Sequence, residues 1–242
     1  MRTQPQLGSN KTGVATSPKL AESMLEGTLE FLPSGVGDER EIAHVREEFV
    51  RDAEPVGSMP PPPTLTGMAK AAKQALKGEH PVVLLDKLGG RLAFERTGTR
   101  LWEAVLSKFD SYGSFEGGPE RSEIERIAQE EFDHFRLLEQ AIKNLGADPT
   151  AVTPTANLQA TLSKGVLEVI VDARTDLAQS LEAILIAELA DNEAWEALIE
   201  LTRQAGDEDL TTSFLVAVAQ EAEHLELVRL WLAHAEARVT PA

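Results

Sequence analysis

The chain has 242 residues and a formal net charge of −17, which disfavours nucleic acid as a partner because a duplex binder needs a basic surface. It contains no cysteine, which excludes disulfides, zinc–thiolate sites and thiol redox chemistry. No uninterrupted apolar run is long enough to span a membrane, and the polar start lacks the apolar segment of a secretory signal, so we expect no membrane partner and a cytoplasmic location.

Residues 1–63 differ from the rest of the chain and are predicted to form a partly disordered N-terminal arm. Gly, Ser, Thr and Pro are frequent in residues 1–18, which favours disorder. Apolar residues at helical spacing predict a short helix over about 39–52, and Pro60–Pro63 favour an extended segment after it. Two hypotheses stay open: the arm docks on a partner or on a sister subunit of a homo-oligomer, or it is a loosely ordered tail.

Residues 64–81 are predicted to form a short helix and a linker, with Thr66 as the N-cap and Gly78 near the helix end. Residues 82–242 are predicted to be all-α. Four long helices are expected there, and their approximate ranges are 82–109, 122–144, 175–204 and 207–237. Residues 110–119 connect the first pair, with Ser122 as the next N-cap. Between the second and third helices, 147–163 is predicted to be a long polar connection, followed by a short helix over about 165–174.

Each long helix carries an apolar seam whose residues recur at alternating steps of three and four. Carboxylates and imidazoles interrupt these seams at Glu95, Glu131, His134, Glu188, Glu221 and His224. A Glu and a His three residues apart share one face of a helix, so each Glu-x-x-His pair can hold one ion from one side. The arrangement occurs twice, and each half pairs a Glu-bearing helix with a Glu-x-x-His helix. This internal duplication is stronger evidence than any single motif.

Burial of four carboxylates close together is unfavourable unless they are protonated or compensated. Two divalent cations would supply the compensating charge, and inward-facing Glu and Glu-x-x-His residues form di-metal sites in helix bundles. Carboxylate and imidazole ligands suit iron or manganese, and they are compatible with zinc. The sequence therefore predicts two Fe or two Mn ions per bundle, with iron favoured.

Several local alternatives remain open. Glu130 could pair with His134 in place of Glu131, although the seam favours Glu131. Asp191 could be a seventh ligand, an acceptor for a ligating histidine N–H, or a polar residue that faces water. Trp102 and Trp195 are interpreted as core packing and not as electron relays. The single tyrosine, Tyr112, is expected beyond the end of the first helix, which argues against a radical tyrosine beside the metals.

These ligand motifs resemble those of the ferritin-like superfamily of di-metal carboxylate proteins, which includes rubrerythrins, bacterioferritins, manganese catalases and aldehyde-deformylating oxygenases. The resemblance covers residues 82–237. It implies an antiparallel ferritin-like four-helix bundle, with a long crossover between the second and third helices and two metal ions that activate dioxygen or peroxide. It further implies that Glu131 and Glu221 bridge the ions while Glu95 and Glu188 are terminal ligands.

The chain departs from the complete rubrerythrins, because without cysteine it cannot hold their rubredoxin iron. The N-terminal arm matches no member of the superfamily that we recognise. The leading hypothesis is an oxidoreductase of the ferroxidase or peroxide-scavenging type that acts on dioxygen or hydrogen peroxide. The alternatives are non-enzymatic iron storage or metal buffering, an oxygenase for a long apolar substrate, and a scaffold or cargo protein that acts through the arm.

Overall fold

The structure, a computed structural model, describes residues 15, 17–30, 39–53, 56, 58–60, 67–69 and 81–238. Every regular element within these residues is an α-helix, which confirms the all-α prediction. The chain divides into a smaller unit within Gln4–Pro55 and a larger unit that contains Val56–Ala242. Residues 67–69 are helical, as predicted after Thr66. The rest of that short helix, the segment Pro61–Pro63 and most of residues 1–18 lie outside the described residues.

The smaller unit contains two helices, α1 (Pro18–Glu30) and α2 (Glu39–Asp52). Helix α2 confirms the short helix predicted over 39–52. Helix α1 was not predicted, although Pro18 at its first position and apolar residues such as Leu25 at helical spacing are signals for it. Large apolar side chains of both helices, including Leu25 and Phe49, are exposed.

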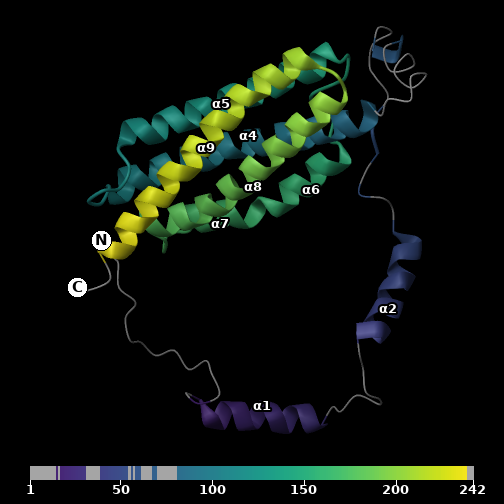
Figure 1. Cartoon of the computed structure of the whole chain (residues 1–242). Helices are drawn as coiled ribbons and strands as arrows, with labels where there is room; N and C mark the ends of the chain where they lie inside the picture. The colour runs from purple at the N-terminus through teal and green to yellow at the C-terminus, as the bar shows by residue number, and fades with distance from the viewer. Residues whose placement is uncertain are drawn as a thin grey trace. The chain divides into compact units, whose positions relative to one another are not determined.

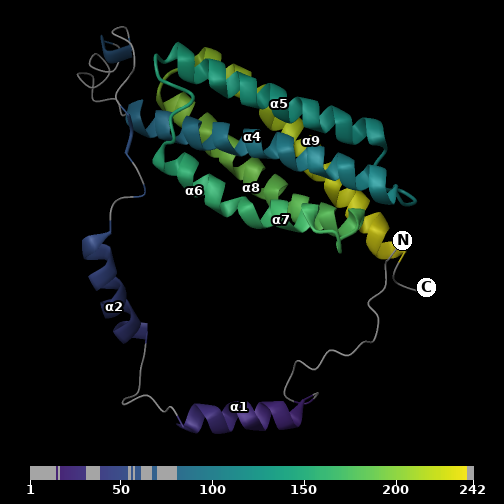
Figure 2. The same ribbon diagram turned by 180° about the vertical axis from the view of Figure 1, so that it is seen from behind.

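Besides the helical residues 67–69, the larger unit contains six helices among its described residues: α4 (Pro81–Tyr112), α5 (Arg121–Asn144), α6 (Pro154–Leu162), α7 (Lys164–Val171), α8 (Leu177–Gln204) and α9 (Glu208–Ala237). Helix α4 contacts α5, α6, α7 and α8, while α9 contacts α5 and α8. Helices α6 and α7 follow one another along the side of α4 and α8 that faces away from α5 (Figures 1 and 2). None of the described helices is long and apolar enough to cross a bilayer.

Helix ends agree with the predicted ranges except at two places. Helix α5 begins at a capping box of Glu120 and Glu123, so Ser122 is not the N-cap. Helix α4 extends beyond 109 to Tyr112, which is therefore helical, and the connection to α5 is correspondingly shorter. The predicted ends of α5 and α8 are confirmed, since Gly146 and Gly206 each follow their helix with a positive φ that favours glycine.

The segment 147–163, predicted to be a long polar connection, contains a further helix, α6, which was not predicted. Its N-cap Thr153 accepts a hydrogen bond from the backbone N–H of Ala156, and Pro154 occupies the first turn, where its missing N–H costs nothing. Helix α6 approaches α4 at a glycine: a Cβ at Gly90 would lie 3.0 Å from Cβ of Thr155. Helix α7 confirms the short helix that was predicted next.

Buried apolar side chains form two clusters. We call them the Trp102 cluster and the Trp195 cluster after their largest members. On each of α4, α5, α8 and α9, residues of one cluster precede the predicted ligands and residues of the other follow them. The predicted ligands therefore lie in the middle of the four helices, with apolar packing at both ends that shields them from water.

Candidate metal centre

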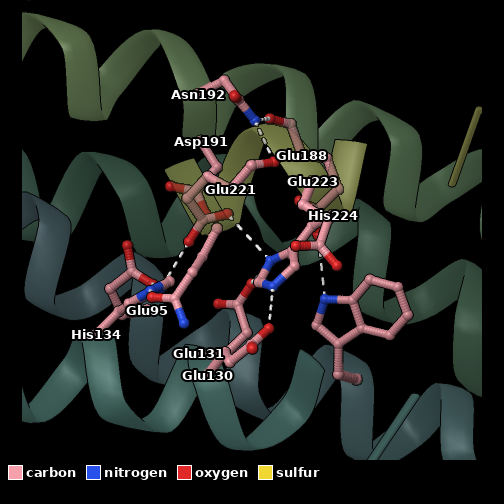
Figure 3. A network of polar contacts seen from close by, with 12 residues as sticks. Glu95, Glu130, Glu131, His134, Glu188, Asp191, Asn192, Glu221, Glu223 and His224 are labelled. Atoms are coloured by element: carbon pink, nitrogen blue, oxygen red, sulfur yellow. Dashed lines mark hydrogen bonds and ion pairs between the residues drawn. The ribbon is translucent and has the colours of Figure 1, made fainter. Parts of the chain in front are cut away.

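The six predicted ligands converge at one buried place in the larger unit (Figure 3). Their exposed fractions are 3% or less. We call the group Glu131, Glu188, Glu221 and His224 the four-ligand position, and we call the group Glu95, His134 and Glu221 the three-ligand position. Within each group one potential ligand atom per residue lies within 4.8 Å of all the others. Glu221 belongs to both positions and lies between them.

His134 and His224 present the same ring nitrogen to the carboxylate cluster. In each ring Nδ1 faces the carboxylates, 2.7 Å from Glu221 Oε1 for His134 and 3.4 Å from Glu221 Oε2 for His224. The Nε2 atoms face the opposite way, 3.0 Å from the side-chain oxygen of Gln220 for His134 and 2.8 Å from Glu130 Oε2 for His224. An acceptor at Nε2 fixes the ring and leaves Nδ1 free to bind a metal.

Glu130 does not pair with His134, and Glu131 is not grouped with His134 either: Glu131 lies with His224, whereas His134 lies with Glu95 and Glu221. Glu130 accepts a hydrogen bond from His224 and is itself held by Arg126, whose guanidinium lies 2.9 Å from its carboxylate. Sequence reasoning did not identify Gln220 or Glu130 as partners of the histidines. Both residues precede a Glu of a Glu-x-x-His pair, and that position beside the seam was the available signal.

Hydrogen-bond donors around the cluster hold its carboxylates and backbone. The Trp102 indole N–H donates to Glu188 Oε1 at 3.1 Å, so this side chain does more than pack in the core, which was the prediction. The Asn192 amide donates to the backbone carbonyls of Glu188 and Glu221 at 2.9 and 3.1 Å, which ties α8 to α9 beside the site. Trp195 packs edge-on against His134, with ring centroids 5.7 Å apart.

Arg91 is a further buried residue of the site that the sequence analysis missed. Its guanidinium donates to both Glu95 and Asp191, and it is only 4% exposed. Asp191, the possible seventh ligand, is thus paired with a cation and accepts no hydrogen bond from a ligating histidine. In the sequence, the signal for Arg91 was its position one helical turn before Glu95 on α4.

Unpartnered polar atoms at the centre indicate that the cluster fits a pair of cations. Glu95 Oε2, Glu131 Oε2 and Glu188 Oε2 have no hydrogen-bond partner. The Glu221 oxygens and the Nδ1 atoms of His134 and His224 lie at ion-pair distance from one another but do not meet hydrogen-bond geometry. Buried polar atoms in folded proteins nearly always have a partner, and an unplaced ion is one reason for an exception. Hard carboxylate oxygens with imidazole nitrogens are the donor set of iron and manganese.

A glycine on α4 makes room for one of these carboxylates. A Cβ at Gly98 would lie 2.9 Å from Cδ of Glu131 and would overlap its Oε2 atom. The Glu131 carboxylate therefore occupies the space that any other residue at position 98 would fill. Because Glu131 belongs to the four-ligand position, this close approach of α4 to α5 is part of the site.

The buried charges perturb one another strongly. Burial, together with the charge of Glu221, raises the pKa of Glu131 to about 8, and burial with two neighbouring carboxylates raises the pKa of Glu188 well above its ordinary value. Burial alone would raise the pKa of Glu221, but the histidines lower it to about 2. Burial alone would lower the histidine pKa values, but carboxylate contacts raise them to about 9 for His134 and about 11 for His224. Protons in the cluster thus occupy the place that divalent ions would take.

A cavity of about 260 Å³ lies beside this region, between α4, α5 and the segment that leads into α6. Its lining includes Leu92, Arg96, Phe135 and Glu139, and none of the six predicted ligands lines it. No protein-family model, no curated protein and no solved structure matches this chain. The functional conclusion therefore depends on the geometry of the cluster.

Proposed function

We propose that the larger unit is a ferritin-like di-metal carboxylate protein, which holds two Fe or two Mn ions, with iron favoured, and acts on dioxygen or hydrogen peroxide. The observation that carries the proposal is the buried convergence of four Glu and two His, in which one carboxylate oxygen each of Glu95, Glu131 and Glu188 lacks a hydrogen-bond partner. Such a set suits two divalent cations, which would balance the four carboxylates.

The order of core clusters along the helices supports an antiparallel four-helix bundle. Helices α5 and α8 run from the Trp102 cluster through the ligands to the Trp195 cluster, whereas α4 and α9 run the other way. Each observed contact among these four helices joins two of opposite direction: α4 with α5, α8 with α9, α4 with α8, and α5 with α9. The segment between α5 and α8, which carries α6 and α7, is then the long crossover of a ferritin-like topology.

The distances also support a bridging role for Glu221. Its Oε1 lies 2.7 Å from Nδ1 of His134, and its Oε2 lies 3.4 Å from Nδ1 of His224, so one oxygen faces each histidine. In this assignment Glu131 is the second bridge. Glu95 and Glu188 are the terminal ligands beside His134 and His224 respectively.

The surroundings of the site favour a small reactant. Two bound redox-active ions would supply the electrons for the reduction of dioxygen or peroxide. The chain contributes a closed, apolar enclosure, since every ligand is nearly fully buried. It also fixes the ligands from outside: Trp102 through Glu188, Glu130 through His224, and the Asn192 amide through the backbone.

The experiment compares the wild type with Glu131→Ala and with Glu125→Ala, an exposed glutamate of the same helix, as the control. Metal content is measured after purification without added metal and after anaerobic incubation with ferrous or manganous ion. Turnover is then measured as oxygen uptake and as peroxide loss. We expect two ions per chain and turnover that Glu131→Ala abolishes and Glu125→Ala retains. Less than about a tenth of an ion per chain, or unchanged turnover in Glu131→Ala, would overturn the proposal, and loading far beyond two ions would favour storage.

A further inference from the structure

The two halves of the centre are related by the internal repeat, and two of the positions at which they differ lie on the Glu-bearing helices beside Glu95 and Glu188. Glu95 and Trp102 of α4 correspond to Glu188 and Trp195 of α8, seven residues apart in each case. By the same spacing Arg91 corresponds to Ile184, and Gly98 corresponds to Asp191. The half that contains Glu95 therefore has a fixed cation beside it, whereas the half that contains Glu188 has an isoleucine at the equivalent position.

This difference changes how the two terminal glutamates are held. The Trp102 indole N–H donates to Glu188, the glutamate of the other repeat. The equivalent Trp195 N–H has no hydrogen-bond partner, and Arg91 is the donor to Glu95 instead. Arg91 lies over the Trp195 ring, with its guanidinium carbon 5.3 Å from the ring centroid. Arg91 thus donates to Glu95, as Trp102 donates to Glu188 in the other half.

The Arg91 charge is permanent and closely confined. A guanidinium does not lose its proton under physiological conditions. The guanidinium carbon of Arg91 also lies 4.7 Å from the centroid of the Phe94 ring. The Nε and Nη1 atoms of Arg91 have no hydrogen-bond partner. Divalent ions at the three-ligand position would meet this charge at short range in an enclosure with little water to screen it. The four-ligand position is served by the neutral Trp102 donor and has no fixed cation at the equivalent place.

We infer that Arg91 makes the two metal positions unequal, so that the four-ligand position fills first and the three-ligand position, which lies beside this fixed charge, fills second and more weakly. Asp191 is the second partner of Arg91 and offsets part of its charge. Its carboxylate also lies within 4.8 Å of ligand atoms of Glu95, Glu131 and Glu221, but Arg91 already holds it, so its role in this inference is to position Arg91. This inference rests on the proposed metal centre.

The test is anaerobic calorimetric titration of the metal-free full chain with cobalt(II), with the visible absorption of bound cobalt as a second signal. In the wild type we expect one ion to bind in each of two steps, with the second step at least tenfold weaker. Glu188→Gln should weaken the tighter step, and Glu95→Gln should weaken the other. Absence of binding overturns both the metal centre and the loading order, whereas two ions of equal affinity overturn the order alone.

Arg91→Met removes the charge but keeps an unbranched side chain that can pack between Phe94 and Trp195. We expect its second step to tighten at least tenfold while the first changes less than twofold. The matched control is Arg121→Met on α5, which removes an arginine that also pairs with a glutamate four residues on but is exposed; both steps should stay unchanged. An unchanged or weaker second step in a folded Arg91→Met protein would overturn the inference.

Asp191→Asn tests the same inference, because it should weaken the second step where Arg91→Met should tighten it. This test does not depend on whether the Arg91→Met protein folds. Without the aspartate, Arg91 is left with Glu95 alone, so the second step should weaken at least threefold; no change would overturn the inference. In the Arg91→Met background, Asp191→Asn should have no further effect. A further loss there would mean that Asp191 binds the metal directly. Helical circular dichroism of each variant verifies folding.

Discussion

Replacement of Gly98 by alanine distinguishes the stability of helix α4, which alanine favours, from the room that the Glu131 carboxylate needs, which only glycine provides. An alanine in the middle of a helix normally stabilises it by about 1 kcal/mol relative to glycine. At position 98 the new methyl group would lie 2.9 Å from Cδ of Glu131 and would overlap the carboxylate. Overpacking of a core costs about 1–3 kcal/mol. The two effects together predict a change in unfolding free energy between zero and a loss of about 2 kcal/mol.

The larger effect is expected on metal binding, because the methyl group displaces a proposed bridging ligand. A perturbation that misorients a ligand from outside typically lowers metal affinity by about 10–100-fold. The assays are urea unfolding of the metal-free protein and anaerobic titration with ferrous ion. The control is Gly165→Ala in α7, where nothing lies within 4 Å of the new Cβ. It should stabilise the protein by about 0.5–1 kcal/mol and leave metal affinity unchanged. A Gly98→Ala protein that is about 1 kcal/mol more stable and binds metal normally would refute the reasoning.

Three further predictions follow from the same structure. Because contacts with carboxylates raise the pKa of His134 to about 9, the folded metal-free protein keeps a proton there that the unfolded chain loses near pH 6.5. Its stability should therefore fall as the pH rises from about 6.5 to 9, and urea midpoints across that range measure this. Glu130→Ala removes the acceptor of His224 Nε2 and should lower metal affinity by about 10–100-fold, measured by competition with a chelator. Phe214→Ala, in the Trp195 cluster, should cost about 3–5 kcal/mol of stability in thermal unfolding, while metal stoichiometry in the folded protein stays the same.

The sequence was most informative where a residue acts within its own helix. The positions of Glu131, His134, Glu221 and His224 follow from helical periodicity alone, and all are buried in the middle of apolar seams. The same periodicity placed the long helices close to their observed ends. A polar residue that recurs at a seam position is unusual enough to be noticed without any knowledge of its neighbours.

The sequence was least informative where a residue acts across helices. Arg91 pairs with Asp191 of α8, which is distant in sequence but packs against α4. Glu130 accepts a hydrogen bond from His224 of α9 and not from His134 of its own helix. Neither pairing is encoded in local spacing, because both depend on which helices become neighbours. Helix α6 was missed for a different reason: it lies in the segment 147–163, which was predicted to be a polar connection, although Pro154 is a residue favoured at a helix start.

The internal repeat has a consequence for how the centre is assembled. One chain carries both copies of the Glu helix and both copies of the Glu-x-x-His helix, so every proposed ligand comes from the same molecule. The proposed metal affinity of the folded chain therefore does not depend on association with a second chain. Any self-association would act on access to the ions or on delivery of reactants. The two copies are also free to diverge independently, which a centre shared between identical subunits could not do.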